Sequence, residues 1–392
     1  MKKWVQHQHA WSMGLAGALM LSLVGCGGGG NDPASAAPAS QGGNPQPVVQ
    51  PDVVNVQDVP VAAGVGYSLG VNASGAVQVW GTGMAGSAPA VANVKAVGAT
   101  RWGGNWAVLA TGDALYWGND ASGALSHASA VSLSGLGRVA ALRACGQGAD
   151  ARLVALKTDG TVRVVSPAGL SASTQGLTVA GLSAVKALVD GGDASCNNVL
   201  AVGANGLVSQ LQVGGTEASA VLVAGLSRVA QASCASDNCL VVTDEGQVWG
   251  WGSNAKGQMG DETVDARVAP AQVDLSLLAT AGVTPKVRQV LLTQAGAAYA
   301  LSENGALYGW GRLDGRVKAT VPGAPGTAPT PILNANFKVQ QVVSASAESG
   351  QTLILSGDGK VFGWGRNAQS EVTSANTATL LSDLTDTGVK LR

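Results

Sequence analysis

Cysteine is the residue type in this sequence whose number and spacing first suggest chemistry. The chain has five cysteines, and four lie well inside it, at Cys145, Cys196, Cys234 and Cys239. An even number is typical of disulfide bonding in an oxidising compartment, and four cysteines can pair in three ways. Cys234 and Cys239 bracket a short loop ahead of a predicted strand. Buried free thiols are the alternative.

Histidine and acidic residues are too sparse here to suggest an active site. His127 is the only histidine after the first nine residues, and its surroundings do not resemble a nucleophile elbow. A zinc site needs three or four nitrogen or sulfur ligands at set spacing. The acidic pairs Asp244-Glu245 and Asp261-Glu262 fall at predicted turns, where solvated side chains are usual. We therefore expect no catalytic residue, no metal site and no cofactor, and predict that the protein is not an enzyme.

Ten of the aromatic residues are tryptophan. Five of these each precede a glycine at one position of a repeat described below, and we expect their indoles to pack between repeats; the alternative is a stacking platform for sugars or bases. Trp102 and Trp106 lie off this column, in Arg-Trp-Gly-Gly-Asn-Trp. We predict that these two are exposed interface anchors, the role in which tryptophan is enriched at interface hot spots. The column consists of Trp80, Trp117, Trp251, Trp310 and Trp364.

The fifth cysteine, Cys26, stands at the end of an apolar run near the N-terminus. Lys2 and Lys3 precede this run, which covers residues 12–24 and is too short to span a bilayer. It ends in Leu-Val-Gly-Cys, which resembles the lipobox of bacterial lipoproteins, where the cysteine is acylated and the peptide is cleaved before it. We predict a signal peptide over residues 1–25 and lipidation of Cys26, which would tether the protein stably. An unmodified cysteine after an ordinary signal or a short anchor is the alternative.

The residues after Cys26 indicate a location and a linker. The resemblance to lipoproteins implies that Gly27, in place of aspartate, favours the outer membrane, facing either the periplasm or the cell surface. Residues 26–51 are rich in Gly, Pro, Ser and Ala and have no periodic apolar face. We expect this stretch to be a flexible, disordered linker. The predicted folded body then covers residues 52–392.

The overall composition favours an all-β body and argues against nucleic acid as a partner. Charged residues are only 12% of the chain, hydrophobic residues 46%, and there are 56 glycines. Many short strands joined by glycine turns produce such a profile. The net charge of −1 offers no basic surface for nucleic acid.

A repeat recurs seven times between residue 52 and the end of the chain. Apolar residues stand six and four positions before a turn glycine and two positions after it, the period-two pattern of half-buried strands. A fourth strand is expected after each hairpin, for example at residues 89–91 in the first repeat. The turn glycines are Gly75, Gly112, Gly160, Gly206, Gly246, Gly305 and Gly359. A Val-x-x-apolar step precedes each of them and begins at Val56, Val94, Val139, Val185, Val229, Val287 and Val339.

These features together predict a seven-bladed β-propeller of four-stranded blades. Asn-Gly at 205–206 and 304–305 and Asp-Gly at 159–160 and 358–359 are strong hairpin signals, because these pairs tolerate positive φ. Stacking such blades around an axis gives each sheet two neighbours and leaves only short edges. A β-sandwich does not require one spacing seven times, and a parallel β-helix has much shorter repeats.

The run Asp-Glu-Gly-Gln-Val-Trp-Gly-Trp-Gly at 244–252, continuing to Gly260, resembles the repeat of the regulator of chromosome condensation. Copies at 304–311 and 358–367 are similar, and the resemblance covers roughly residues 52–392. Two departures are that no repeat keeps the family's histidine before the turn, and that the third and fourth copies lack Trp-Gly. The family includes an exchange factor for a small GTPase, a light receptor and a secreted inhibitor of β-lactamases. The resemblance therefore implies the fold rather than one function.

The repeats also place the cysteines and suggest a role. Cys145 and Cys196 occupy comparable positions in neighbouring repeats, so we predict the pairs 145–196 and 234–239. The alternative of free thiols is supported by the Cys-Gly pair at 145–146, which matches reduced cytosolic relatives. We predict a membrane-tethered, monomeric binding module that holds a protein or glycan partner on one rim. An envelope scaffold without a discrete ligand, or a hydrolase acting from the central channel, are the alternatives.

The C-terminus carries a truncated eighth copy of the Val-x-x-apolar step, at residues 389–392. The chain therefore ends where another blade would begin. We predict that residues 389–391 lie beside residues 56–61, so that the two ends of the body meet in one blade and close the ring.

Overall fold

The computed structural model describes residues 60–391, except for 101, 121, 190–195, 215, 280–281, 314–325, 334–336, 345–350, 371, 377 and 379. The chain divides into two units, residues 1–50 and 51–392. The predicted signal peptide, Cys26 and the linker lie outside the described residues, so the structure described below is that of the second unit.

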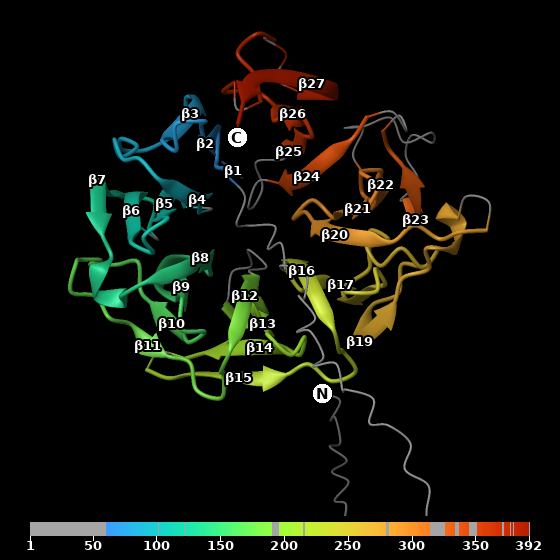
Figure 1. Cartoon of the computed structure of the whole chain (residues 1–392), viewed down its shortest axis with the longest axis horizontal. Coiled ribbons are helices and arrows are strands. Elements are labelled where there is room, and N and C mark those ends of the chain that lie inside the picture. Colours follow the sequence, from blue (N-terminus) through green and yellow to red (C-terminus); the bar gives the residue numbers. More distant parts are fainter. Residues whose placement is uncertain are drawn as a thin grey trace, which may run out of the picture. The chain divides into compact units, whose positions relative to one another are not determined.

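Seven antiparallel sheets surround a common axis (Figure 1), which confirms the predicted all-β, seven-bladed propeller. In each sheet the strands follow one another in chain order, from an inner strand near the axis to an outer strand at the rim. Six sheets have four strands, and the first has three described strands. The fourth strand predicted at residues 89–91 is absent: these residues form no strand. Proline at position 89 has no N–H to donate to a sheet.

The blades are numbered in chain order. Blade 1 contains β1 (Val61–Ala63), β2 (Tyr67–Val71) and β3 (Val77–Gly81); blade 2 contains β4 (Val94–Ala99), β5 (Gly104–Leu109), β6 (Ala114–Asn119) and β7 (Leu125–Ser132). Blade 3 contains β8 (Val139–Cys145), β9 (Arg152–Lys157), β10 (Val162–Val165) and β11 (Leu177–Thr178); blade 4 contains β12 (Val185–Val189), β13 (Leu200–Gly203), β14 (Val208–Val213) and β15 (Ala218–Leu222).

Blade 5 contains β16 (Val229–Ala235), β17 (Asn238–Thr243), β18 (Val248–Gly252) and β19 (Arg267–Gln272); blade 6 contains β20 (Val287–Leu292), β21 (Ala297–Ser302), β22 (Leu307–Gly311) and β23 (Gly326–Pro331). Blade 7 contains β24 (Val339–Ser344), β25 (Gln351–Ser356), β26 (Lys360–Arg366) and β27 (Leu380–Lys390). Short 3-10 turns occur at η2 (Ser134–Leu136), η3 (Gly148–Asp150), η4 (Cys196–Asn198) and η5 (Ser276–Leu278).

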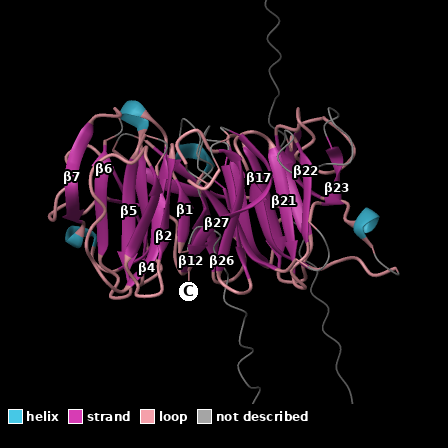
Figure 2. Cartoon of the chain, turned by 90° about the horizontal axis from the view of Figure 1, so that it is seen from above, coloured by secondary structure: helices cyan, strands magenta, loops and turns pink. Residues whose placement is uncertain are grey.

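The sequence landmarks coincide with the strand boundaries. In blades 2 to 7 the inner strand begins at the valine of the predicted Val-x-x-apolar step, here called the head valine. The first of the seven predicted steps, at residues 56–59, lies outside the described residues. All seven turn glycines have φ between 74° and 88°, a left-handed conformation that glycine adopts without steric cost. These turns lie on one face of the ring, here called the turn face; Figure 2 shows the strands running from it to the opposite, loop face.

One backbone hydrogen bond joins successive blades at the turn face. The N–H of each head valine donates to the carbonyl of the turn glycine in the preceding blade. Directly after each head valine the register shifts by a β-bulge, which bends the inner strand at this point. The six bonds are Val94–Gly75 (2.9 Å), Val139–Gly112 (2.7 Å), Val185–Gly160 (3.1 Å), Val229–Gly206 (3.0 Å), Val287–Gly246 (3.3 Å) and Val339–Gly305 (3.1 Å).

The C-terminus makes a seventh bond to a turn glycine. The N–H of Leu391 donates to the carbonyl of Gly359 at 2.8 Å, so the third residue of the truncated step, rather than its valine, fills the place of a head valine, and this bond lies within blade 7. The Leu391 side chain reaches blade 1, where a methyl group added at Gly70 would lie 3.0 Å from Leu391 Cδ2. Val61 of β1 shares a buried cluster with Val389 and Leu391. The prediction that the C-terminus closes the ring against blade 1 is therefore correct in its location.

The same prediction is wrong about how the ring closes. Among the described residues the two ends lie in different blades, because β1 pairs with β2 in blade 1 and β27 pairs with β26 in blade 7. The joint between blades 7 and 1 consists of side-chain packing and of polar bonds between blades. Gln351 Nε2 donates to the Tyr67 carbonyl at 3.2 Å, and the Thr82 N–H donates to the Gln369 carbonyl at 3.1 Å.

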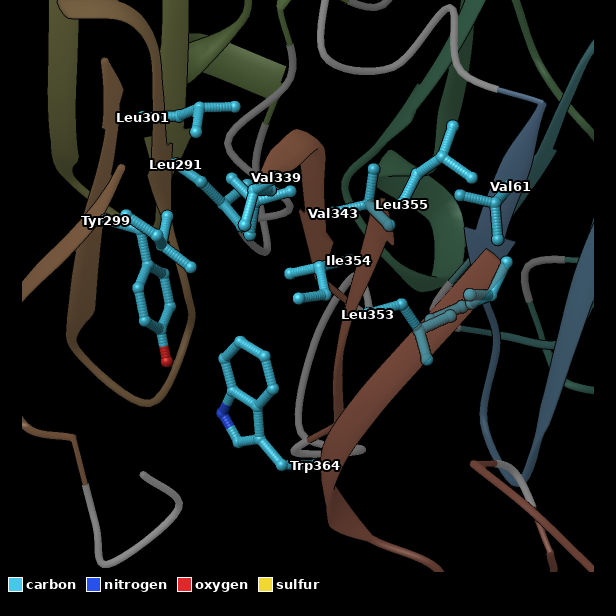
Figure 3. Close-up of a cluster of buried hydrophobic side chains, with 14 of the residues drawn as sticks. Val61, Leu291, Tyr299, Leu301, Val339, Val343, Leu353, Ile354, Leu355 and Trp364 are labelled. Carbon is cyan, nitrogen blue, oxygen red and sulfur yellow. The ribbon is translucent and has the colours of Figure 1, made fainter. Parts of the chain in front are cut away.

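The hydrophobic core is divided among the joints between blades. The largest cluster lies where blades 6, 7 and 1 meet and includes Tyr299, Leu353 and Trp364 (Figure 3). The rings of Tyr299 and Trp364 contact each other edge to face, with centroids 6.0 Å apart. Each blade buries both of its faces only by contact with two neighbours, which explains why the repeats do not stand alone.

Candidate functional site

The two tryptophans predicted to be exposed anchors are buried, so that prediction is wrong. The exposed fraction of Trp102 is 8% and that of Trp106 is 4%. Trp102 Nε1 donates to the hydroxyl of Tyr116 at 3.1 Å. The Trp106 indole occupies space that a side chain at position 98 would fill, because a methyl group added at Gly98 would lie 2.0 Å from Trp106 Cε2. Both indoles thus lie in the core of blades 2 and 3, and Gly98 leaves the space that Trp106 fills.

The four inner cysteines form two disulfides, in the pairing expected from the sequence. Cys145 at the end of β8 bonds to Cys196 of η4, which links blades 3 and 4 on the loop face. Cys234 and Cys239 lie opposite each other on β16 and β17 within blade 5. All four sulfurs lie at the loop-face ends of three consecutive blades, but only the Cys145–Cys196 bond links two blades.

Column tryptophans differ in whether the preceding blade covers them. Trp117, Trp310 and Trp364 are fully buried, as expected for packing between blades. Trp310 of blade 6 also donates from Nε1 to the Gln258 carbonyl of blade 5 at 2.7 Å. Trp251 of blade 5 occupies the equivalent position five residues after its turn glycine, yet its side chain is partly exposed.

Residues 253–266, between β18 and β19, form the segment that covers Trp310. Gly260 lies against the indole, since a methyl group added there would be 2.8 Å from Trp310 Nε1. Lys256 Nζ donates to the Ala295 carbonyl at 3.1 Å, and the Glu262 N–H donates to the carbonyl of Thr327 on β23 at 2.9 Å. This covering segment thus binds blade 6 through its backbone and one ammonium group.

Buried Asn254 and partly buried Asp261 hold the covering segment in shape. Asn254 Oδ1 accepts from the Met259 N–H at 2.9 Å, and its Nδ2 donates to the Thr263 carbonyl at 3.1 Å. Burial raises the pKa of Asp261, but hydrogen bonds from Arg267 and Thr263 outweigh it and keep that pKa below its ordinary value. Arg267 Nε donates to Asp261 Oδ2 at 2.7 Å, which fixes the arginine at the start of β19.

Blade 4 has no segment of this length to cover Trp251. Only residues 214–217 separate β14 from β15, and the Gly214 N–H donates to the Glu217 carbonyl at 2.8 Å. A groove of ≈ 900 Å³, here called the rim groove, therefore opens between the outer parts of blades 4 and 5. Its lining includes residues 197–198, 210, 221–224, 237, 251–253 and 266–270.

The walls of the rim groove are apolar and exposed. On β15 the exposed fractions of Val221 and Leu222 are 58% and 56%, and that of Val268 on β19 is 101%. Both strands are the outer strands of their blades. Val223 and Trp251 also pack on the buried cluster between blades 4 and 5, so the groove continues that interface outward. Clustered exposed apolar side chains are typical of interaction sites.

Charged groups lie in the rim groove and in a separate pocket nearby. At the loop face, Asp237 is exposed beside Trp251 in the lining. Toward the turn face a smaller pocket of ≈ 80 Å³ contains Trp249, Arg228 and Asp244. Arg228 Nε lies 2.9 Å from Asp244 Oδ1, and this hydrogen bond and charge raise the pKa of Arg228.

Sequence inspection missed Val221, Leu222 and Val268 because their types and spacing are ordinary for outer strands. One signal was available: only a short stretch separates the third and fourth strands of blade 4, before a blade that has Trp-Gly. His127, by contrast, is engaged, with Nδ1 2.8 Å from Ser126 Oγ and Nε2 3.3 Å from the Leu170 carbonyl. Among the described residues no group of three or more His, Cys, Asp and Glu is placed to hold a metal. Within the same ranges, no helix is long and apolar enough to cross a membrane.

The fold and the rim groove define a β-propeller with an open apolar site between two blades. Two sequence profiles of the regulator of chromosome condensation (RCC1) repeat match residues 229–258 and 245–290. The chain is thus a seven-bladed propeller in which residues 229–290 match the RCC1 repeat.

Curated relatives match only part of the chain. The mouse (Mus musculus) E3 ubiquitin-protein ligase HERC2 is 29% identical over 163 residues, 40% of this chain and 3% of that protein. The ultraviolet-B receptor UVR8 of Arabidopsis thaliana is 35% identical over 86 residues, 21% of this chain and 18% of the receptor. The human (Homo sapiens) RCC1-like G exchanging factor-like protein is 31% identical over 138 residues, 35% of this chain and 28% of that protein. The matched region therefore spans less than a third of each of these relatives.

Solved structures with the same fold include the yeast protein Prp20p from Saccharomyces cerevisiae, in a study of its binding to Gsp1p and histones. Its TM-score is 0.57 at 16% identity, covering 75% of this chain and 76% of that one. Yeast RCC1 (Prp20) with bound Kap60 gives a TM-score of 0.56 at 16% identity, covering 76% and 75%. At this identity the likeness shows the fold alone.

Proposed function

We propose that this propeller binds a protein partner in the rim groove between blades 4 and 5. The observation that carries the proposal is the partly exposed Trp251 beside the fully exposed Val268, at a position where three other blades bury the indole completely. Exposed tryptophan in an apolar setting is typical of binding hot spots. Prp20p, which has the same fold, is described as binding Gsp1p and histones, and this supports a protein as the partner.

A protein suits the groove better than a sugar does. The walls are aliphatic, from Val221, Leu222 and Val268, and the groove runs between two outer strands whose backbone can pair with another chain. Carbohydrate sites need several polar side chains around the aromatic ring. Several polar groups of the lining are engaged within the chain: Arg267 by Asp261, Gln210 by the Asn197 carbonyl and Asn198 by the Ser236 carbonyl.

Comparative capture tests this function. The full chain, immobilised, is exposed to an envelope extract, and retained proteins are identified and then purified for a direct binding measurement. Val268→Glu and Trp251→Ala should weaken that binding about tenfold or more. Val283→Glu is the matched control, because Val283 has an exposed fraction of 71% and does not line the groove. Equal binding by all variants would place any partner elsewhere and favour an envelope scaffold without a discrete ligand.

We further propose that Cys26 tethers the propeller to a membrane through lipid. The support is the sequence Leu-Val-Gly-Cys after an apolar run and before a Gly/Pro/Ser-rich stretch. Labelling cells with a clickable fatty acid should mark the wild-type chain and not Cys26→Ala. Ser22→Ala is the control and should be labelled normally. Equal labelling of wild type and Cys26→Ala would contradict the tether and with it the outer-membrane location.

A further inference from the structure

Two joints show how a covering segment binds the outer strand of the next blade. The N–H of Ser87 in blade 1 donates to the carbonyl of Ala128 on β7 at 3.0 Å, and Glu262 of blade 5 makes the same bond to Thr327 on β23. Ala128 and Thr327 occupy equivalent positions. The glycine after each column tryptophan pairs with a residue of the outer strand, and Ala128 and Thr327 each come one residue after that partner. In blade 5 that glycine, Gly252, pairs with Arg267.

Val268 is therefore the equivalent position in blade 5. Its exposed fraction is 101%, and no described segment of blade 4 donates a backbone hydrogen bond to it. Among the described residues, the outer strand of blade 5 thus lacks the backbone hydrogen bond that the outer strands of blades 2 and 6 accept from the preceding blade.

The glycine after each column tryptophan gives a second, independent comparison. A methyl group added at Gly81, Gly118 or Gly311 would meet a carbonyl of the preceding blade: Gln369 at 3.3 Å, Ala85 at 3.2 Å and Lys256 at 3.5 Å. At Gly252 the three nearest atoms all belong to Asp237 and Asn238 of the same blade. None of these three atoms comes from blade 4, whereas a carbonyl of the preceding blade is among the three nearest atoms in the other three blades.

We propose that the partner docks a short extended segment here and supplies the cover that blade 4 lacks. A backbone N–H of that segment donates to the Val268 carbonyl, and a backbone carbonyl accepts from Trp251 Nε1. A glycine lies flat on the Trp251 indole, as Gly260 lies on Trp310. This inference rests on the proposed function and names the kind of segment that the groove takes.

Charge complementarity adds a basic residue to the segment. In blade 6, Lys256 of the covering segment donates to Ala295 in the turn between β20 and β21. The corresponding turn of blade 5 contains the exposed Asp237. A lysine or arginine of the docked segment, at the position equivalent to Lys256, would therefore contact the Asp237 carboxylate instead of a backbone carbonyl. Because the site continues the interface between blades 4 and 5, the docked segment would extend a surface that is already packed.

The chain's own covering segment is the natural probe. A peptide of residues 253–264, Ser-Asn-Ala-Lys-Gly-Gln-Met-Gly-Asp-Glu-Thr-Val, is titrated into the full chain with ¹⁵N-labelled tryptophan. The indole N–H signal of Trp251, assigned by its loss in Trp251→Phe, should shift and saturate. Peptides with Gly260→Val or Lys256→Glu should bind about tenfold more weakly or worse, because the first clashes with the indole and the second repels Asp237.

Several results would overturn this inference. They are a Trp251 signal that does not move, a shift confined to other indoles, or equal binding of the Gly260→Val peptide. A Trp251 signal that responds to a cello- or chito-oligosaccharide and not to the peptide would replace the protein segment by a sugar. If the peptide fails while Val268→Glu still abolishes partner binding, the docking mode is wrong and the proposed function stands. If both fail, the proposed function falls as well.

Discussion

The joint between blades 5 and 6 and the joint between blades 3 and 4 occupy equivalent places in the ring but are held differently. Between blades 5 and 6, the covering segment lies on Trp310 and hydrogen-bonds its indole. Between blades 3 and 4 there is no tryptophan: position 211 is leucine, and the Cys145–Cys196 disulfide ties the two loop-face ends.

The inner strands of these joints also use different side chains for one task. Gln231 of blade 5 binds the backbone of Val290 in blade 6, accepting from its N–H at 2.8 Å and donating to its carbonyl at 3.2 Å. In blade 3, buried Arg143 donates from Nε to the Leu188 carbonyl of blade 4 at 2.9 Å. Both of these joints thus have an inner polar clamp and an outer fastening, which is a covered indole in one and a disulfide in the other.

The joint between blades 4 and 5 has neither fastening at its outer end. The Cys234–Cys239 disulfide lies within blade 5, and Trp251 is not covered by a described segment of blade 4. The rim groove is therefore a joint left open at its outer end.

The largest effect is expected from removing the disulfide between blades 3 and 4. Cys145→Ser with Cys196→Ser opens a loop whose ends are 51 residues apart. On chain entropy alone the free energy of unfolding should fall by about 4 kcal/mol. Urea unfolding of the double variant and of wild type measures the difference. The pair Cys234→Ser and Cys239→Ser, 5 residues apart, is the control and should lose only about 2 kcal/mol. Equal losses would show that the joint does not depend on this bond.

Deleting residues 386–392 should be next in size. The deletion removes buried Val389 and Leu391 and the bond from Leu391 to Gly359. Burial of two aliphatic side chains predicts a loss of about 3 kcal/mol, spread over the whole ring because blades 7 and 1 separate. Scanning calorimetry should show one transition at lower temperature. An unchanged melting temperature would mean that this segment is a tail and not part of the ring closure.

A smaller loss is expected for Trp310→Phe, which removes the indole N–H and leaves the Gln258 carbonyl buried without that donor. The free energy of unfolding should fall by about 2 kcal/mol. Trp251→Phe is the matched comparison and should cost less than about 0.5 kcal/mol, since its side chain is partly exposed. Similar losses for the two variants, measured by urea unfolding, would contradict the distinction between a covered and an open joint.

The smallest effect concerns pH. The pKa of Asp261 is below its ordinary value when folded, so its contribution to stability is full above the unfolded pKa of about 3.9. It is lost as the pH falls through the folded pKa. Because this carboxylate and its arginine lie near the surface, where solvent screens charge, the effect should be below about 1 kcal/mol. Amide hydrogen exchange in residues 253–266 should accelerate below pH 4 beyond the intrinsic rate in wild type, and show no such step in Asp261→Asn.

The repeat can be predicted almost completely from the sequence, because it depends on local rules. Each turn glycine needs positive φ, and each strand needs apolar residues two apart, so seven hairpins and six head valines follow from the residues alone. Cysteine positions within the repeats lead to the observed disulfide pairing by the same logic. The truncated step at residues 389–392 locates the end of the chain correctly, since it repeats a pattern that always meets a turn glycine.

What lies on the surface was decided only by the tertiary structure. Trp102 and Trp106 are off the column, yet both are buried: the Trp106 indole lies against Gly98, and Trp102 hydrogen-bonds the buried Tyr116. Trp251 is on the column and was expected to be packed, yet the connection before it in space, residues 214–217, is too short to cover it. Whether a side chain is exposed depends on the length of the segment with which the neighbouring blade can cover it. The period-two pattern within one blade does not specify that length.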